Sequence, residues 1–309
     1  MVQPSRILVI ANAGAGTADE QALDAAVAIL REHAEVEVRE TSGPDELAAA
    51  LTGSPDDERI VIAGGDGSIH AAVAALHRLD QLRGQEIGLI PLGTGNDFAR
   101  TLEIPLDPRA AAGVAATGRA QPVDLVVDDH GQVTVNSVHL GAGAQAGKKG
   151  ARWKERLGAI GLGKVNLGKL GYPIGAVLTA LDPPSLRLRV EVDGRLVLDE
   201  DEPALMVAVG NGSSTGGGTR LTPAAQPHDG KADILVATPG SHVARLGYAL
   251  RLPFGSHSQR GDVQMLRGET IRVSGDEFEL NSDGEIDGPV RSRTWKVLPS
   301  AYSMVVPEA

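Results

Sequence analysis

Two glycine-rich turns of this chain read Ala-Gly-Gly-Asp-Gly-Ser-Ile-His at residues 63–70 and Pro-Leu-Gly-Thr-Gly-Asn-Asp-Phe at residues 91–98. Each turn follows a short strand-like run and opens into a helix-like segment. We therefore expect both turns at the carboxyl ends of parallel strands, where α/β sheets bind nucleotides. Glycine suits this place because a Cβ would hold the backbone away from a phosphate, and Gly64, Gly65 and Gly67 can adopt positive φ at little cost.

Each turn also carries an acidic residue, Asp66 in the first and Asp97 in the second. A carboxylate beside a phosphate is repelled unless a divalent cation lies between them, so this pair favours a site for a metal-bound nucleotide. A single Gly-Gly-Asp-Gly sequence is also common turn chemistry. Two such turns at successive strand ends favour phosphate binding over an ordinary turn.

The first part of the chain alternates between strand-like and helix-like runs, which predicts a parallel sheet covered by helices on both faces. The strand-like runs are Arg6–Ala11, Val36–Thr41, Arg59–Ala63 and Glu86–Ile90, and the helix-like runs are Ala18–His33, Asp45–Leu51 and Ile69–Leu79.

The second part has short alternating runs separated by turn residues, which predict an antiparallel sheet or sandwich. These runs are Gln132–Val138, Leu186–Val192, Arg195–Leu198, Leu205–Val209, Ala232–Ala237, Thr270–Ser274 and Phe278–Asn281. Asp193-Gly194 between two of them is typical of a hairpin turn. We therefore expect an α/β domain at residues 1–125, a β-rich domain at 126–295 and a tail at 296–309 that can return to the first domain.

Together these turns resemble the diacylglycerol kinase catalytic family, which includes bacterial lipid kinases and the sphingosine and ceramide kinases. Further matching stretches follow in the family's order: Asn12–Gly16, Gly210-Asn211, Gly216–Gly218, Pro223, Asp229–Asp233 and Asp283–Glu285. The resemblance covers nearly the whole chain, from residue 7 to residue 307. The succession is a strong indication, whereas any one motif is weak.

The resemblance implies an α/β nucleotide-binding domain, a β-rich, NAD kinase-like second domain and an active site in the cleft between them. It implies an ATP- and magnesium-dependent kinase that phosphorylates a lipid hydroxyl, most simply converting diacylglycerol to phosphatidic acid. Two alternatives remain open: an NAD kinase, and a nucleotide-binding regulator that has lost catalysis. Gly93–Asp97 and Asp283–Glu285 favour the lipid branch, and the retained carboxylates argue against the regulator.

The phosphate cradle is assigned to the two turns. Its members are Gly64, Gly65, Asp66, Gly67, Ser68, Ile69, His70, Thr94, Gly95 and Asn96. By the resemblance, Asn12, Gly16 and Thr41 line the other side of the nucleotide. His70 departs from the family, which commonly has Asn at this place.

Asp66 and Asp97 are the candidate ligands of the ATP magnesium, directly or through water, and the resemblance adds Asp124. The resemblance also implies a second, structural magnesium held by Asp229, with the backbone carbonyls of Gln226 and Lys231 as partners. Hard oxygen ligands suit magnesium. Asp124 could equally be an ordinary strand-end residue, and Asp229 an ordinary turn residue.

Asp283 and Glu285 flank Gly284 directly after a strand, so one tight turn carries two carboxylates. Neighbouring carboxylates disfavour double ionisation, which raises one pKa towards the range of a general base. We expect this pair to supply the proton acceptor and its partner, and the sequence does not decide which is which. An ordinary Asp-Gly hairpin turn is the competing interpretation.

The composition limits the class of protein. The chain has no cysteine, which excludes disulfides and a thiol nucleophile, and its net charge of −11 argues against general affinity for nucleic acid. No apolar run has the length of a membrane-spanning helix, and the first residues do not resemble a signal peptide. We expect a cytoplasmic protein.

One basic segment stands apart in this acidic chain. Residues 147–172 carry seven Lys or Arg side chains against the single acid Glu155, with Trp153 among them. Such a segment is either a solvated helix and loop or a contact surface for anionic lipid headgroups. We expect it to attach the enzyme peripherally to the membrane that holds its lipid substrate. The sequence also leaves a homodimer open.

Overall fold

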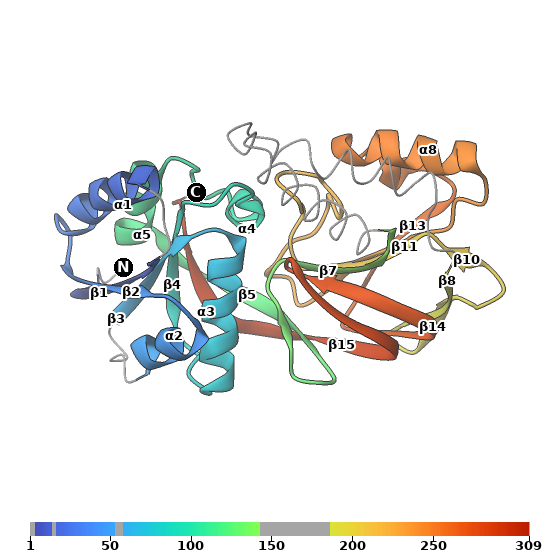
Figure 1. Cartoon of the computed structure of the whole chain (residues 1–309), viewed down its shortest axis with the longest axis horizontal. Helices are drawn as coiled ribbons and strands as arrows, with labels where there is room; N and C mark the ends of the chain where they lie inside the picture. The colour runs from blue at the N-terminus through green and yellow to red at the C-terminus, as the bar shows by residue number, and fades with distance from the viewer. Residues whose placement is uncertain (1–3, 14–16, 53–57, 143–185, 309) are drawn as a thin grey trace, which may run out of the picture. The chain divides into compact units, whose positions relative to one another are not determined.

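The computed structural model describes residues 4–13, 17–52, 58–142 and 186–308, and its chain divides into two compact units (Figure 1). The α/β unit comprises Met1–Leu125 and Leu298–Ala309, and the sandwich unit comprises Val126–Val297. The chain leaves the α/β unit within strand β5 (Arg119–Asp128) and returns to it within strand β15 (Glu285–Val306). An α/β unit joined to a β-rich unit confirms the predicted fold class.

The α/β unit contains a parallel sheet with the strand order β4-β3-β1-β2. Its strands are β1 (Arg6–Asn12), β2 (Glu35–Thr41), β3 (Glu58–Gly64) and β4 (Glu86–Pro91). The last part of β15 adds to β4 in parallel through Ser303 and Met304. Since the strands are parallel, the turns that follow β1, β3 and β4 all lie at one edge of the sheet.

Helices cover both faces of this sheet, with α1 and α5 on one face and α2 and α3 on the other (Figure 1). The helices are α1 (Thr17–Leu30), α2 (Pro44–Leu51), α3 (Asp66–Arg78), α4 (Asp97–Thr101) and α5 (Pro108–Thr117). Alternate residues of β1 point to opposite faces of the sheet and are buried under the helices on each face. Ile7 and Val9 pack with Val27 of α1. Because α1 and α2 lie on opposite faces of the sheet, successive strands are added in opposite directions on the two sides of the β1–β3 pair. Parallel α/β sheets bind ligands at this point, at the carboxyl ends of the strands.

The sandwich unit is antiparallel, with the strand order β13-β12-β11-β7-β14-β15, and β8 pairs with residues 271–275 of β14. Its strands are β6 (Val133–Thr134), β7 (Ser137–Gly141), β8 (Leu186–Val192), β9 (Arg195–Leu198), β10 (Pro203–Ala204), β11 (Met206–Gly210), β12 (Ala232–Ala237), β13 (Val263–Gly268) and β14 (Thr270–Ser282). The predicted hairpin joins β8 to β9: Asp193 and Gly194 have φ values of 50° and 74°, and Val192 pairs with Arg195.

Both faces of β11 and β12 are buried. Val207 and Val209 of β11 lie in the sandwich core, whereas Met206 and Ala208 lie in a second cluster beneath helix α8 (His242–Arg251). The sequence did not predict α8, although its start carries a signal: the Ser241 hydroxyl accepts a hydrogen bond from the amide of Ala244, at 3.2 Å. In the described ranges, no helix has the length and apolar character that crossing a bilayer requires.

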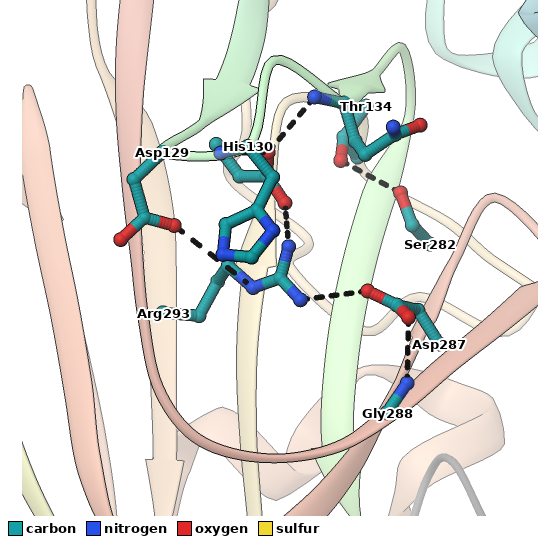
Figure 2. A network of polar contacts seen from close by, with 9 residues as sticks. Asp129, His130, Thr134, Ser282, Asp287, Gly288 and Arg293 are labelled. Atoms are coloured by element: carbon teal, nitrogen blue, oxygen red, sulfur yellow. Dashed lines mark hydrogen bonds and ion pairs between the residues drawn. The ribbon is translucent and has the colours of Figure 1, made fainter.

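A buried guanidinium ties three parts of the sandwich unit together (Figure 2). Arg293 of β15 is 1% exposed and contacts three carboxylates. It donates to Asp128 and, at 2.7 Å, to Asp287, and its Nε lies 3.9 Å from Asp129 Oδ1. The other oxygen of Asp128 accepts from the amides of His130 and Gln132. The network therefore fixes the end of β5 and the turn after it against β15.

Arg293→Met should destabilise the sandwich unit by about 3 to 5 kcal/mol, because it leaves the buried Asp128 carboxylate without its cation. Arg291→Met is the matched control: Arg291 is 70% exposed and pairs with Glu277 on the surface, so a change of about 0 to 1 kcal/mol is expected. Urea unfolding followed by Trp295 fluorescence, in a Trp153→Phe background, measures both. Equal losses in the two variants would contradict a structural role for the network.

Candidate active site

The two glycine-rich turns contact each other through their backbones. A Cβ built on Gly93 would lie 2.5 Å from the Cα of Gly65, and the Leu92 amide donates to the carbonyl of Gly64 at 3.0 Å. Glycine is therefore required at Gly65 and Gly93 by close approach. None of Gly64, Gly65 and Gly67 uses the positive φ that glycine allows, and Gly65 has a φ of −96°.

Asp66 links the two turns at the start of α3. Its Oδ2 accepts from the amide of Asp97 and its Oδ1 from the amide of Phe98, both at 3.0 Å. These are the first amides of α4, which its own turn cannot satisfy. A carboxylate oxygen can accept more than one contact, so the bonds to α4 do not by themselves prevent Asp66 from binding a cation.

Asn96 shapes the second turn from inside it. It has a φ of 52°, is buried, and bonds Gly93 twice: Oδ1 accepts from the amide at 3.1 Å and Nδ2 donates to the carbonyl at 2.7 Å. The Gly95 carbonyl accepts from Arg100 Nε. Thr94 is exposed at the tip. Of the three predicted binding residues in this turn, Thr94 has the side chain that is placed to reach a ligand.

The first turn divides into a surface part and a buried part. Gly67 is exposed, with no atom within 4 Å of an added Cβ. Ser68 packs against Gly64, where a Cβ would lie 2.2 Å from the Ser68 hydroxyl oxygen. Ile69 and His70 are buried in α3. Those two were predicted to bind the nucleotide, but their side chains belong to the packing of the α/β unit.

Asn12 and Thr41 lie side by side at the carboxyl ends of β1 and β2, where they are register partners. The amide of Ala13 donates to the Thr41 carbonyl at 3.1 Å, and the Thr41 hydroxyl donates to the carbonyl of Ala11 at 3.5 Å. This places both predicted residues at the same sheet edge as the glycine-rich turns. Gly16 lies outside the described residues.

The predicted set of three magnesium carboxylates is not assembled. Asp124 is 1% exposed in β5, and its Oδ1 accepts from the amide of Ser300 at 2.8 Å, at the bend where β15 enters the α/β unit. Asp97 is also buried. Within the parts of the chain that the structure describes, no group of three or more Asp, Glu or His side chains could hold a metal ion.

At the predicted structural magnesium site, Asp229 forms an ion pair with an arginine side chain. Arg267 of β13 forms an ion pair with Asp229, whose other oxygen accepts from the amide of Lys231 at 3.1 Å. Arg267 Nε also lies 3.6 Å from the buried Asp233. Burial raises the pKa of Asp233 to about 6, the nearby Arg267 opposes this, and Asp229 adds to it. Gln226 is exposed in the preceding turn.

Asp283 and Glu285 have different environments on the β14–β15 turn. The Asp283 carboxylate accepts three backbone hydrogen bonds, from Val135 at 2.6 Å, Asn136 at 3.0 Å and Ser137 at 2.8 Å. Its φ of 50° completes the Asp-Gly hairpin turn that the sequence offered as the competing interpretation. Glu285 is exposed and pairs with Ser282 through the backbone. The two carboxylates of the expected pair therefore differ: Asp283 holds the turn to the backbone of Val135–Ser137, and Glu285 is exposed.

The predicted lipid-contact segment at residues 147–172 lies outside the described residues. Gly93 was noted only as part of the second turn and was not assigned to the site, and Arg267 was not predicted at all. Gly93 carried a signal, since it repeats the glycine of the first turn. Arg267 carried none, because its carboxylate partners lie on other strands.

Comparison with known proteins gives matches over both units. The model of the diacylglycerol kinase catalytic domain matches residues 6–127, and that of the YegS C-terminal NAD kinase beta sandwich-like domain matches residues 155–306. A "Probable lipid kinase YegS-like" of Xanthomonas campestris pv. campestris (strain 8004) is 32% identical over 90% of this chain and 89% of its own length.

Two further relatives span the same range. A "Diacylglycerol kinase" of Mycobacterium tuberculosis (strain ATCC 25618 / H37Rv) is 28% identical over 93% of this chain and 90% of its own length. The crystal structure of "a putative diacylglycerol kinase from Bacillus anthracis str. Sterne" superposes with a TM-score of 0.79 at 23% identity, covering 98% of this chain and 97% of the other. That likeness establishes the shared fold.

Asp233 should make the stability of the sandwich unit fall as pH rises. The folded protein binds the Asp233 proton more tightly than the unfolded chain does, since its pKa moves from 3.8 to about 6. This stabilisation is complete below about pH 4 and is lost as pH rises through 6, so Asp233→Asn should match the parent at pH 4 and exceed it by about 2 to 3 kcal/mol at pH 7. Urea unfolding at both values, with the exposed Asp199→Asn as control, measures the difference. A constant gap between parent and Asp233→Asn across this range would refute the assignment.

Proposed function

Since the chain belongs to the family of lipid kinases with a diacylglycerol kinase catalytic domain, we propose that it transfers the γ-phosphate of ATP to the hydroxyl of diacylglycerol, with magnesium as cofactor. The observation that carries the proposal is the pair of turns at the ends of β3 and β4, which Asp66 and the Gly65–Gly93 contact hold together. The similarity to the diacylglycerol kinase of Mycobacterium tuberculosis supports diacylglycerol as the acceptor.

The first turn of α3 fits a phosphate. Gly67 is exposed there, the space beside it is open, and α3 is a full helix of 13 residues whose N-terminus favours an anion. The exposed Thr94 hydroxyl of the neighbouring turn can donate to a phosphate oxygen. The chain thus binds the nucleotide mainly through backbone amides, without a Gly-Lys-Ser phosphate loop.

Asp66 and Asp97 are the carboxylates that would hold magnesium beside these phosphates. Magnesium typically keeps several waters and takes one or two carboxylates plus phosphate oxygens, so a dedicated three-carboxylate cluster is not required. The ion would neutralise charge on the phosphates during transfer. The Asp66 carboxylate cannot swing away, because both oxygens also hold the start of α4.

Glu285 is the proton acceptor in this proposal. It is exposed on a turn that the three hydrogen bonds of Asp283 hold rigid against Val135–Ser137. A kinase needs a group that accepts the proton of the attacking hydroxyl, and an exposed carboxylate on a fixed turn can do so. The role of Asp283 is indirect: it fixes the turn and thereby positions Glu285.

Gly67→Val should weaken nucleotide binding with little effect on stability, because the added side chain fills the open space at the start of α3 where the phosphate would bind. Gly113→Val in α5 is the matched control, since an added Cβ there also meets nothing within 4 Å. Calorimetric titration with ATP and magnesium measures affinity, and a loss of at least about tenfold in Gly67→Val is expected. If both valine variants bind ATP like the parent, the cradle lies elsewhere.

Glu285→Gln should lower turnover by about a hundredfold or more while leaving nucleotide affinity and stability near the parent values. Asp283→Asn should instead lower the stability of the sandwich unit by about 1 to 3 kcal/mol, because an amide cannot accept the same three hydrogen bonds. Glu277→Gln on the same strand pair is the control for a lost surface charge.

The assay uses labelled ATP with diacylglycerol, NAD or no acceptor. Transfer to NAD alone would identify the NAD kinase alternative, and ATP binding without any transfer would identify a regulator. Normal turnover of Glu285→Gln on the true acceptor would remove Glu285 from the mechanism.

A further inference from the structure

Helix α8 presents an apolar stripe to solvent. Val243, Leu246, Leu250 and Phe254 recur every three or four residues and are 82%, 41%, 59% and 79% exposed. This spacing places them along one side of α8 and of the short helix η2 (Leu252–Phe254) that continues it. Single exposed apolar residues are ordinary, but a contiguous stripe marks a surface that binds something apolar.

The core of the sandwich unit does not use this stripe. The opposite side of α8 and η2 supplies Tyr248, Ala249 and Leu252, all buried, and Tyr248 and Leu252 pack with Met206 and Leu235 of the sheet. The helix is therefore apolar on two sides, one turned to the protein and one turned to solvent. The stripe can be altered without opening the core.

Two exposed arginines, Arg220 and Arg251, lie near the C-terminal end of the stripe. From residue 234 to residue 261 the chain has no Asp or Glu, although its net charge is −11. Arg251 is exposed at the end of α8, and the Arg220 side chain lies beside Gly255, 3.2 Å from the position of an added Cβ. The charge of Arg260 is balanced by its ion pair with Asp262.

We propose that α8 and η2 form a docking face for a bilayer that contains anionic phospholipid. The apolar stripe enters the headgroup region, and Arg220 and Arg251 contact phosphates at its border, the arrangement of interfacial amphipathic helices. A second copy of this chain is a poorer occupant, because a symmetric contact would bring like-charged arginines together. This inference rests on the proposed function in one respect: the proposed lipid substrate resides in such a bilayer, so the enzyme must bind there to reach it.

The absence of cysteine allows a direct test. A single Cys introduced by Phe254→Cys and labelled with an environment-sensitive fluorophore reports whether this position enters a membrane. Leu196→Cys on β9, at a residue 48% exposed in the same unit, is the matched control. The probes are vesicles of phosphatidylcholine alone and with about 30 mol % phosphatidylglycerol. We expect a blue shift at residue 254 with the anionic vesicles and none at residue 196.

Co-sedimentation with the anionic vesicles measures how strongly each variant binds the membrane. The double variant Leu250→Asn, Phe254→Asn should bind about tenfold more weakly at every salt concentration, whereas Leu196→Asn should bind like the parent. The pair Arg220→Gln, Arg251→Gln should lose binding mainly at low salt, because salt screens the headgroup attraction. Arg195→Gln is its control.

Three outcomes would overturn the inference: no vesicle binding by the parent, equal shifts at residues 254 and 196, or a parent dimer that the Leu250→Asn, Phe254→Asn variant converts to monomer. Turnover of monomerically dissolved short-chain diacylglycerol separates this test from that of the proposed function. The docking variants should retain that turnover and lose it only on vesicles. Insertion of residue 254 without any lipid phosphorylation would leave the docking face standing and remove the proposed reaction.

Discussion

The Asp66 carboxylate holds together the part of the α/β unit on which the candidate site depends. It is the first residue of α3, yet both of its oxygens bind amides of α4, a segment that begins 31 residues later. A single side chain therefore closes the gap between two successive strand-to-helix turns. The missing side chains of Gly65 and Gly93 let the backbones approach closely enough for those bonds to form. The position of the second turn relative to the first follows from this one carboxylate and the close contact of the two glycines.

Much of the architecture was predictable because periodicity is a local property. The predicted runs for β1 and β3 agree with the structure to within one residue at each end, and that for β8 agrees exactly in both bounds. The unexpected elements are those whose pattern depends on distant partners. Helix α8 is a different case: its sequence is strongly amphipathic, but its apolar stripe faces solvent and not the core.

The candidate site was predictable in its position but less so in the task of each residue. Glycine and aspartate turns at strand ends marked the correct sheet edge. The hydrogen-bond partners of Asp283 lie almost 150 residues away, at Val135–Ser137, and no pattern around Asp283 reveals them. The same holds for Asp229, whose partner Arg267 belongs to β13. A turn aspartate looks alike in sequence whether it binds a metal, a cation side chain or backbone amides.

Strand β15 sets an order for biosynthesis. Its first half pairs with β14 in the sandwich unit and its last residues pair with β4 in the α/β unit, so one strand completes both sheets. On the ribosome, β1 to β4 emerge long before Ser303 and Met304, and the edge of β4 must wait until the whole sandwich unit has been translated. During that interval β4 is an open strand edge, the kind of surface that chaperones protect in nascent chains. The α/β unit, although it is encoded first, can be finished only last.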